Sequence, residues 1–145
     1  MSYVLVKYLH IVAILFMFAC LVVEHLLIKQ NMNPKELRRL ATIDLIYGVS
    51  AILTFIAGLL LWFGVGKPAQ FYSASMFFHI KVTLFVVIGL LSIYPTKTFL
   101  SLRRSPEELV TLPKVIIMLV RVELLIMLVL PLFAVLMAQG FGQIR

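Results

Sequence analysis

The chain has 145 residues, a hydrophobic fraction of 63% and a formal net charge of +7. Only 13% of its residues are charged, about half of the roughly 25% usual in soluble domains, so too few polar side chains are available to cover a soluble fold. The same hydrophobicity excludes intrinsic disorder. The basic residues gather in short segments beside apolar runs, which is typical of contact with lipid headgroups. The composition therefore predicts an integral membrane protein that contacts membrane lipid and binds no nucleic acid.

Four apolar stretches are long enough to cross a bilayer, because a helix of roughly 20 residues spans its hydrocarbon core. In chain order they are Val4–Ile28, Ile43–Val65, Met76–Tyr94 and Val115–Ala138. Each run is about twice as long as a tilted barrel strand and lacks the alternation of one. We therefore expect an all-α fold in which residues 1–145 form one transmembrane four-helix bundle.

The basic residues of the connections predict the orientation of this bundle. Eight of the thirteen Lys and Arg residues flank the first and third connections, and three lie on the opposite side. The eight are Lys29, Lys35, Arg38, Arg39, Lys97, Arg103, Arg104 and Lys114, and the three are Lys7, Lys67 and Arg145. By the positive-inside rule, we expect a multi-pass protein of a bacterial inner membrane with both termini in the periplasm.

Two histidines lie inside the first and third predicted spans. Ionisable groups at such depth are costly and commonly functional. At 1.5 Å per residue, His10 lies ~9 Å and His79 ~5 Å inside the periplasmic ends of their helices. Two imidazoles at one depth, on helices running in the same direction, match the axial ligands of a b-type haem. The alternative is two interfacial histidines, each bonded to a neighbouring carbonyl or headgroup.

A lysine accompanies each histidine. Lys7 lies on the same helical face as His10, where it fits either a contact with haem propionates or an anchor at the membrane interface. Lys81 follows His79 by two residues, so the two side chains point about 200° apart on a helix. Lys81 can therefore snorkel outward or act internally, but it cannot share a partner with His79.

A second group of charged residues lies in the spans near the predicted cytoplasmic side. It consists of Glu24, Asp44, Arg121 and Glu123, with His25 close by. We expect Arg121 to pair with Glu24 or Asp44, because an unpaired charge at that depth costs several kcal/mol. Such a network would lock the helices together. A proton path from the cytoplasm is the alternative interpretation.

Several short motifs resemble known families. The stretches Lys7–His10, Ile43–Gly48 and Leu90–Thr96 resemble an uncharacterised family of small four-helix predicted membrane proteins of bacteria. More distantly, Lys7-x-x-His10 and His79-x-Lys81 are similar to motifs of the superfamily that holds the HemJ-type protoporphyrinogen oxidases and copper-resistance D-like membrane proteins.

The HemJ resemblance implies that His10 binds haem and that Lys81 is functionally important. HemJ proteins carry a Tyr-His pair near the end of the third helix, where this chain has Tyr94-Pro95. The resemblance therefore extends to the haem site but not to the full set of residues found in the oxidases.

Two redox functions follow from these residues. The first is a haem b-binding protein with His10 and His79 as axial ligands and with Lys7 and Lys81 at the propionates or the porphyrin edge. Ligation by both histidines favours electron transfer, with a redox partner that the sequence does not identify. The second is a HemJ-like oxidoreductase in which Lys81 or Tyr94 handles protons.

A third function, from another class, is a haem-free small transporter or an accessory membrane subunit, with the inner charged residues as a relay or a lock. A homodimer is a further expectation, because Trp62 and Phe63 lie near the outer rim of a bundle with much apolar surface.

Overall fold

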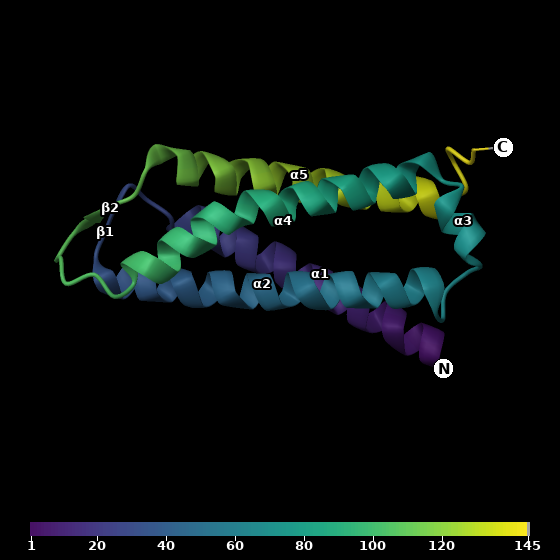
Figure 1. Ribbon diagram of the computed structural model, residues 1–145, viewed down its shortest axis with the longest axis horizontal. Helices are drawn as coiled ribbons and strands as arrows, with labels where there is room; N and C mark the ends of the chain where they lie inside the picture. The colour runs from purple at the N-terminus through teal and green to yellow at the C-terminus, as the bar shows by residue number, and fades with distance from the viewer. Residues whose placement is uncertain (145) are drawn as a thin grey trace.

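The computed structural model describes residues 1–144 and consists almost entirely of helix (Figure 1). The long helices are α1 (Ser2–Leu27), α2 (Pro34–Phe63), α4 (Met76–Leu102) and α5 (Lys114–Ala138). The short elements are β1 (Asn31–Met32), α3 (Ala69–Ser73) and β2 (Val110–Thr111). Each long helix is long and apolar enough to cross a membrane, which confirms the expectation of an all-helical chain with four candidate spans.

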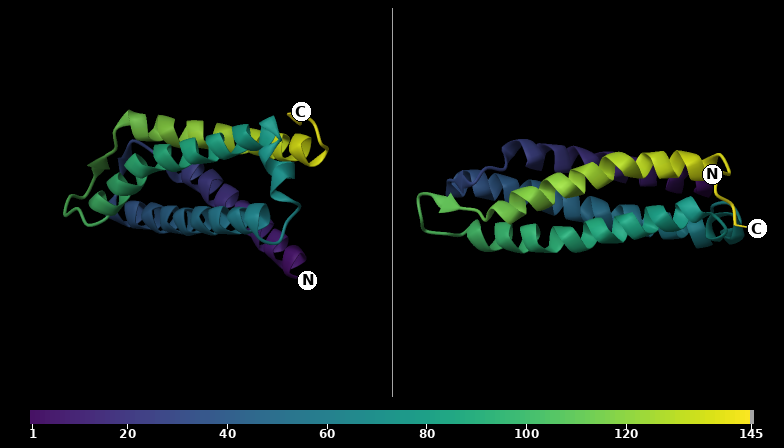
Figure 2. Two further views of the ribbon diagram at one scale, coloured as in Figure 1. Left: turned by 45° about the vertical axis from the view of Figure 1, so that its right-hand side comes forward. Right: turned by 90° about the horizontal axis from the view of Figure 1, so that it is seen from above.

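The long helices pack as two pairs. α1 packs mainly on α2 and α4 mainly on α5, while α1–α5 and α2–α4 contacts join the pairs. α1 and α4 therefore occupy opposite corners of the bundle. Both termini lie at one end together with α3, and the β1 and β2 segments lie at the other (Figures 1 and 2). These are called the terminal end and the loop end below.

Helix α2 begins at Pro34, well before the apolar stretch that starts at Ile43. A capping box sets this start: the Asn33 side chain accepts a hydrogen bond from the Glu36 backbone N–H (2.8 Å), and Glu36 Oε2 accepts one from the Asn33 N–H (3.0 Å). Proline at the first position fits the same role. The helix thus starts outside the apolar segment, because capping and not hydropathy decides where a helix begins.

Helix α4 continues to Leu102, past the end expected at Tyr94. Pro95 lies inside the helix and is buried, since a proline in a span is tolerated where neighbouring helices pack around it. At its start, Ser75 caps α4 and accepts a hydrogen bond from the Phe78 N–H (3.3 Å). The preceding Ser73 is the last residue of α3.

The most tightly packed part of the core lies toward the loop end. Apart from Ser75, the side chains with 0% exposure are Leu21, Leu37, Leu40, Ile88, Phe99, Leu112, Ile116 and Val120. Most of them come from the loop-end halves of the helices, and Leu112 follows directly after β2. At the terminal end, α1 diverges from α4 and α5 (Figures 1 and 2). The two ends of the bundle therefore offer different environments to polar groups.

Candidate functional site

His10 lies on α1 and faces α2, half-buried. Its Nδ1 donates a hydrogen bond to the Thr54 carbonyl oxygen at 3.0 Å, because a carbonyl can only accept. The ring can approach α2 because residue 58 is glycine: a Cβ at Gly58 would lie 3.4 Å from His10 Cε1. The bond at Nδ1 leaves Nε2 available, which is how metal-binding histidines are commonly held.

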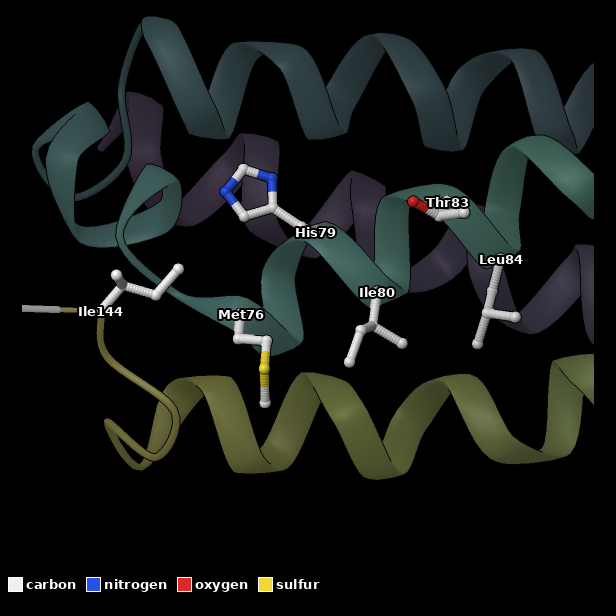
Figure 3. Close-up of a pocket in the computed structure, with 6 residues that line it drawn as sticks. All are labelled: Met76, His79, Ile80, Thr83, Leu84 and Ile144. Carbon is white, nitrogen blue, oxygen red and sulfur yellow. The ribbon is translucent and has the colours of Figure 1, made fainter.

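His79 lies on α4 and is exposed. Its Nε2 donates to the Ser73 carbonyl oxygen at 2.7 Å. In Figure 3 the His79 ring points the opposite way from the side chains of Met76 and Ile80. All three residues line one shallow apolar depression. Joint iron ligation by both histidines would require His79 to release Ser73 and reach across the bundle toward α1.

Lys81 turns toward the bundle interior. On α4 it lies within about 20° of Ile88, a fully buried residue, whereas His79 lies about 180° from Ile88. The Lys81 ammonium lies 5.4 Å from the centroid of the buried Phe78 ring. In residues 1–144 no carboxylate forms an ion pair with it. The structure therefore brings Lys81, and not His79, to the His10 side of the interior.

Lys7 and Tyr94 lie away from this interior. Lys7 is exposed, with its ammonium 5.5 Å from the centroid of the Tyr3 ring, as in an interfacial anchor. Tyr94 is 47% exposed and lies about 20 Å along α4 from Lys81 at 1.5 Å per residue. Lys81 and Tyr94 therefore cannot act on the same atom of a small substrate.

The two rim aromatic residues differ in their surroundings. Trp62 packs within the chain, 4.7 Å from Phe78 between ring centroids, and its indole N–H donates to Ser73 Oγ at 3.2 Å. Phe63 is 67% exposed. Of this pair, only Phe63 offers a largely uncovered ring to a neighbouring molecule.

A cluster of carboxyl groups is buried in the half of the bundle nearer the loop end. Glu24 of α1, Asp44 of α2 and Glu123 of α5 are 1%, 3% and 1% exposed. The Glu24 and Asp44 carboxyl groups lie close to each other where α1 packs on α2. Tyr47 Oη donates to Glu123 Oε2 at 3.3 Å. We refer to Glu24, Asp44, Tyr47 and Glu123 as the acidic cluster.

The expected partner of this cluster, Arg121, is not part of it, and that prediction was wrong. Arg121 is exposed and forms no ion pair; within residues 1–144 the one ion pair is Lys29–Glu36. The reason is helical phase: Arg121 is two residues from Glu123 and so points about 200° away from it. Sequence reasoning grouped these residues by depth and missed Tyr47, which the three-residue spacing from Asp44 on one face of α2 could have found.

The family comparison agrees with this architecture. The model of a family described as predicted membrane protein, DUF2214, matches residues 2–142 and so includes all four long helices. No curated protein sequence and no solved structure matches the chain. The match confirms the nearer of the two resemblances seen in the sequence, that to small predicted membrane proteins. The chain belongs to the DUF2214 family of predicted membrane proteins.

Proposed function

We propose that the protein binds haem b at the terminal end of the bundle through His10 and has a redox role. The observation that supports this most directly is the 3.0 Å hydrogen bond from His10 Nδ1 to the Thr54 carbonyl. It fixes the ring and its tautomer and leaves Nε2 to bind iron. Bound haem would supply a one-electron redox centre.

The residues around His10 fit one axial ligand and one counter-charge. Thr54 holds the imidazole, and Gly58 leaves room for it beside α2. Lys81 brings an interior positive charge without a carboxylate partner in residues 1–144, which suits a haem propionate. His79 would be the second axial ligand only after leaving the Ser73 carbonyl.

A HemJ-like porphyrinogen oxidase is the second candidate. The observation that favours it is the position of Lys81, which lies on the interior face of α4 with its ammonium 5.4 Å from the centroid of the buried Phe78 ring. An amine there can hold or release a proton beside a substrate. Tyr94 would take no part at that atom, because it lies about 20 Å further along α4. Turnover of a porphyrinogen by the purified protein, lost in Lys81→Met, would distinguish this candidate from electron transfer.

The orientation proposed with this function places both termini in the periplasm of a bacterial inner membrane. The support is the excess of basic residues at the loop end, where all eight of the flanking Lys and Arg residues lie. A reporter that is active only in the cytoplasm, fused after residue 144, should be silent. Strong activity would show that the orientation is the opposite one and that the proposed haem site lies on the cytoplasmic side. A homodimer through Phe63 and an unidentified redox partner belong to the same proposal.

The absorption spectrum of the protein purified in mild detergent tests haem binding. We expect a Soret band that His10→Ala removes. His25→Ala is the matched control, because His25 lies about 22 Å further along α1 and cannot reach the same iron. His79→Ala should convert a six-coordinate spectrum into a five-coordinate one if both histidines bind. A protein that stays colourless after haem addition would contradict the proposal and favour a haem-free transporter or accessory subunit.

A further inference from the structure

The acidic cluster concentrates negative groups where the bundle offers no positive ones. Glu24, Asp44 and Glu123 come from three different helices and are 1–3% exposed. The nearby Arg121 is exposed and points away from it, and within residues 1–144 the one ion pair lies at the surface between Lys29 and Glu36. Three ionised carboxylates in this setting would be strongly unfavourable, because burial removes their hydration and leaves their mutual repulsion unscreened.

Glu24 and Asp44 avoid that cost when one of them carries a proton. An ionised carboxylate has only acceptor oxygens, so two neighbouring carboxyl groups form a hydrogen bond only when one of them is protonated. Like charges that share a site are known to hold one proton between them. The burial of these carboxyl groups without a cation partner in residues 1–144 therefore favours at least one bound proton.

Further acceptor atoms at the cluster point the same way. Glu24 Oε1, Asp44 Oδ2 and Glu123 Oε1 are buried and have no hydrogen-bond partner within residues 1–144, and neither has His25 Nδ1. Buried polar atoms are normally paired, so these oxygens are acceptors that a bound proton would satisfy.

We propose that the acidic cluster is a proton-binding site inside the membrane, in which Glu24 and Asp44 share one proton and Glu123 with Tyr47 forms a second arm. This proposal does not depend on haem binding. The other titratable groups near the pair are Cys20 and His25, both on α1. On α4, the group nearest to Asp44 is the hydroxyl of Thr96, which does not titrate.

The site is closed toward the loop end. A layer of fully buried apolar side chains lies between the acidic cluster and the loop end. It contains Leu37 and Leu40 on α2, Phe99 on α4 and Ile116 on α5. Leu112, just beyond β2, completes this apolar layer. A proton on the pair is thus separated from bulk water, and its exchange requires these side chains to move apart.

A lipid-soluble carbodiimide tests the proposal on the intact protein in liposomes, because this reagent forms adducts with protonated carboxyl groups in apolar surroundings. At neutral pH, mass spectrometry of the fragments should locate the adduct on Glu24 or Asp44. Glu36, which is exposed and paired with Lys29 at 2.9 Å, should remain unmodified. An adduct on Glu36 with none on Glu24 or Asp44 would overturn the proposal. No variant is needed for this result, so it does not depend on whether a mutant folds.

Infrared spectroscopy gives a second readout. The wild-type protein at neutral pH should show the carbonyl band of a protonated carboxylic acid. Glu24→Gln should remove at least half of that band, since the amide supplies the hydrogen that the proton supplied to Asp44. Glu36→Gln is the matched control and should leave the band unchanged. A band of equal strength in Glu24→Gln and the wild type, with both proteins monodisperse and helical, would show that the pair holds no proton.

Discussion

The two ends of the bundle bury their ionisable groups to different extents. Toward the loop end, Glu24 and Glu123 are 1% exposed beneath a layer of fully buried apolar side chains. At the terminal end, His10 and Lys81 are half-buried and His79 is exposed. Each of the three buried carboxyl groups has an oxygen without a hydrogen-bond partner in residues 1–144, whereas His10 and His79 each bind a backbone carbonyl. The comparison teaches that a membrane bundle can tolerate polar groups either by closing tightly around them or by leaving room beside them.

The chain connections explain why the two ends differ. At the loop end, β1 pairs with β2 and the Leu112 N–H donates to the Gln30 carbonyl at 2.6 Å, so the two helix pairs are tied together. At the terminal end, the Met76 N–H donates to the Gly142 carbonyl at 2.9 Å, which ties α4 to the segment after α5. Within residues 1–144 no comparable backbone bond holds the start of α1 to these helices, so α1 diverges there.

The largest effect should come from a cavity at the loop end. Phe99 has 0% exposure, and Phe99→Ala should destabilise the protein by about 3–5 kcal/mol, because the packed side chains around it cannot collapse fully into the space. Phe63→Ala makes the same chemical change at a 67% exposed site of the terminal end and should cost about 0.5 kcal/mol or less. Denaturation of both variants in one detergent would measure the difference. Equal losses would mean that the two ends are packed alike.

Alkaline pH should weaken the loop end next. Removing the shared proton leaves Glu24 and Asp44 ionised, buried and mutually repelling, so the free energy of unfolding should fall by about 1–3 kcal/mol as pH rises. The stabilisation is fully present where the carboxyl groups of the unfolded chain are also protonated, falls as pH rises beyond that range, and is lost once the folded pair has released its proton. The double variant Glu24→Gln/Asp44→Asn should unfold with a flatter alkaline pH dependence. An unchanged slope would place the titrating group elsewhere.

An effect of similar size is expected where α1 approaches α2 at the terminal end. In Gly58→Leu the new Cβ lies 3.4 Å from His10 Cε1, and the rest of the side chain would displace the imidazole from the Thr54 carbonyl. Overpacking of this kind typically costs about 1–3 kcal/mol, and the Soret band should weaken or shift. Gly48→Leu is the control on the same helix, since a Cβ added at Gly48 would meet no atom within 4 Å in the described chain. Identical spectra for both variants would show that haem does not bind through His10.

The smallest effect should come from Arg121. Because this residue is exposed and pairs with no carboxylate in the described chain, Arg121→Leu should change stability by no more than about 0.5 kcal/mol. Lys67→Leu should behave in the same way. If a thermal melt showed that Arg121→Leu alone is strongly destabilised, Arg121 would form the ion pair with the acidic cluster that the structure does not contain.

Part of the candidate site could be read from helical periodicity. The two-residue spacing of His79 and Lys81 required them to face opposite ways, and the structure agrees. The same rule, applied to Arg121 and Glu123, would have removed the expected ion pair. The sequence could not decide which member of each pair faces inward, because that depends on where the neighbouring helices lie around α4 and around α5.

The sequence by itself determined the four helices and the shared end of the two termini, because the length and hydropathy of a span depend only on the solvent that it must cross. The sequence did not determine where the helices begin and end, since the Asn33 cap depends on local hydrogen bonds and the continuation of α4 through Pro95 depends on neighbouring helices. Only the tertiary structure joined Glu24 to Asp44 and His10 to Thr54. Those contacts connect different helices, and the rotation of each helix about its axis is set by packing with its neighbours.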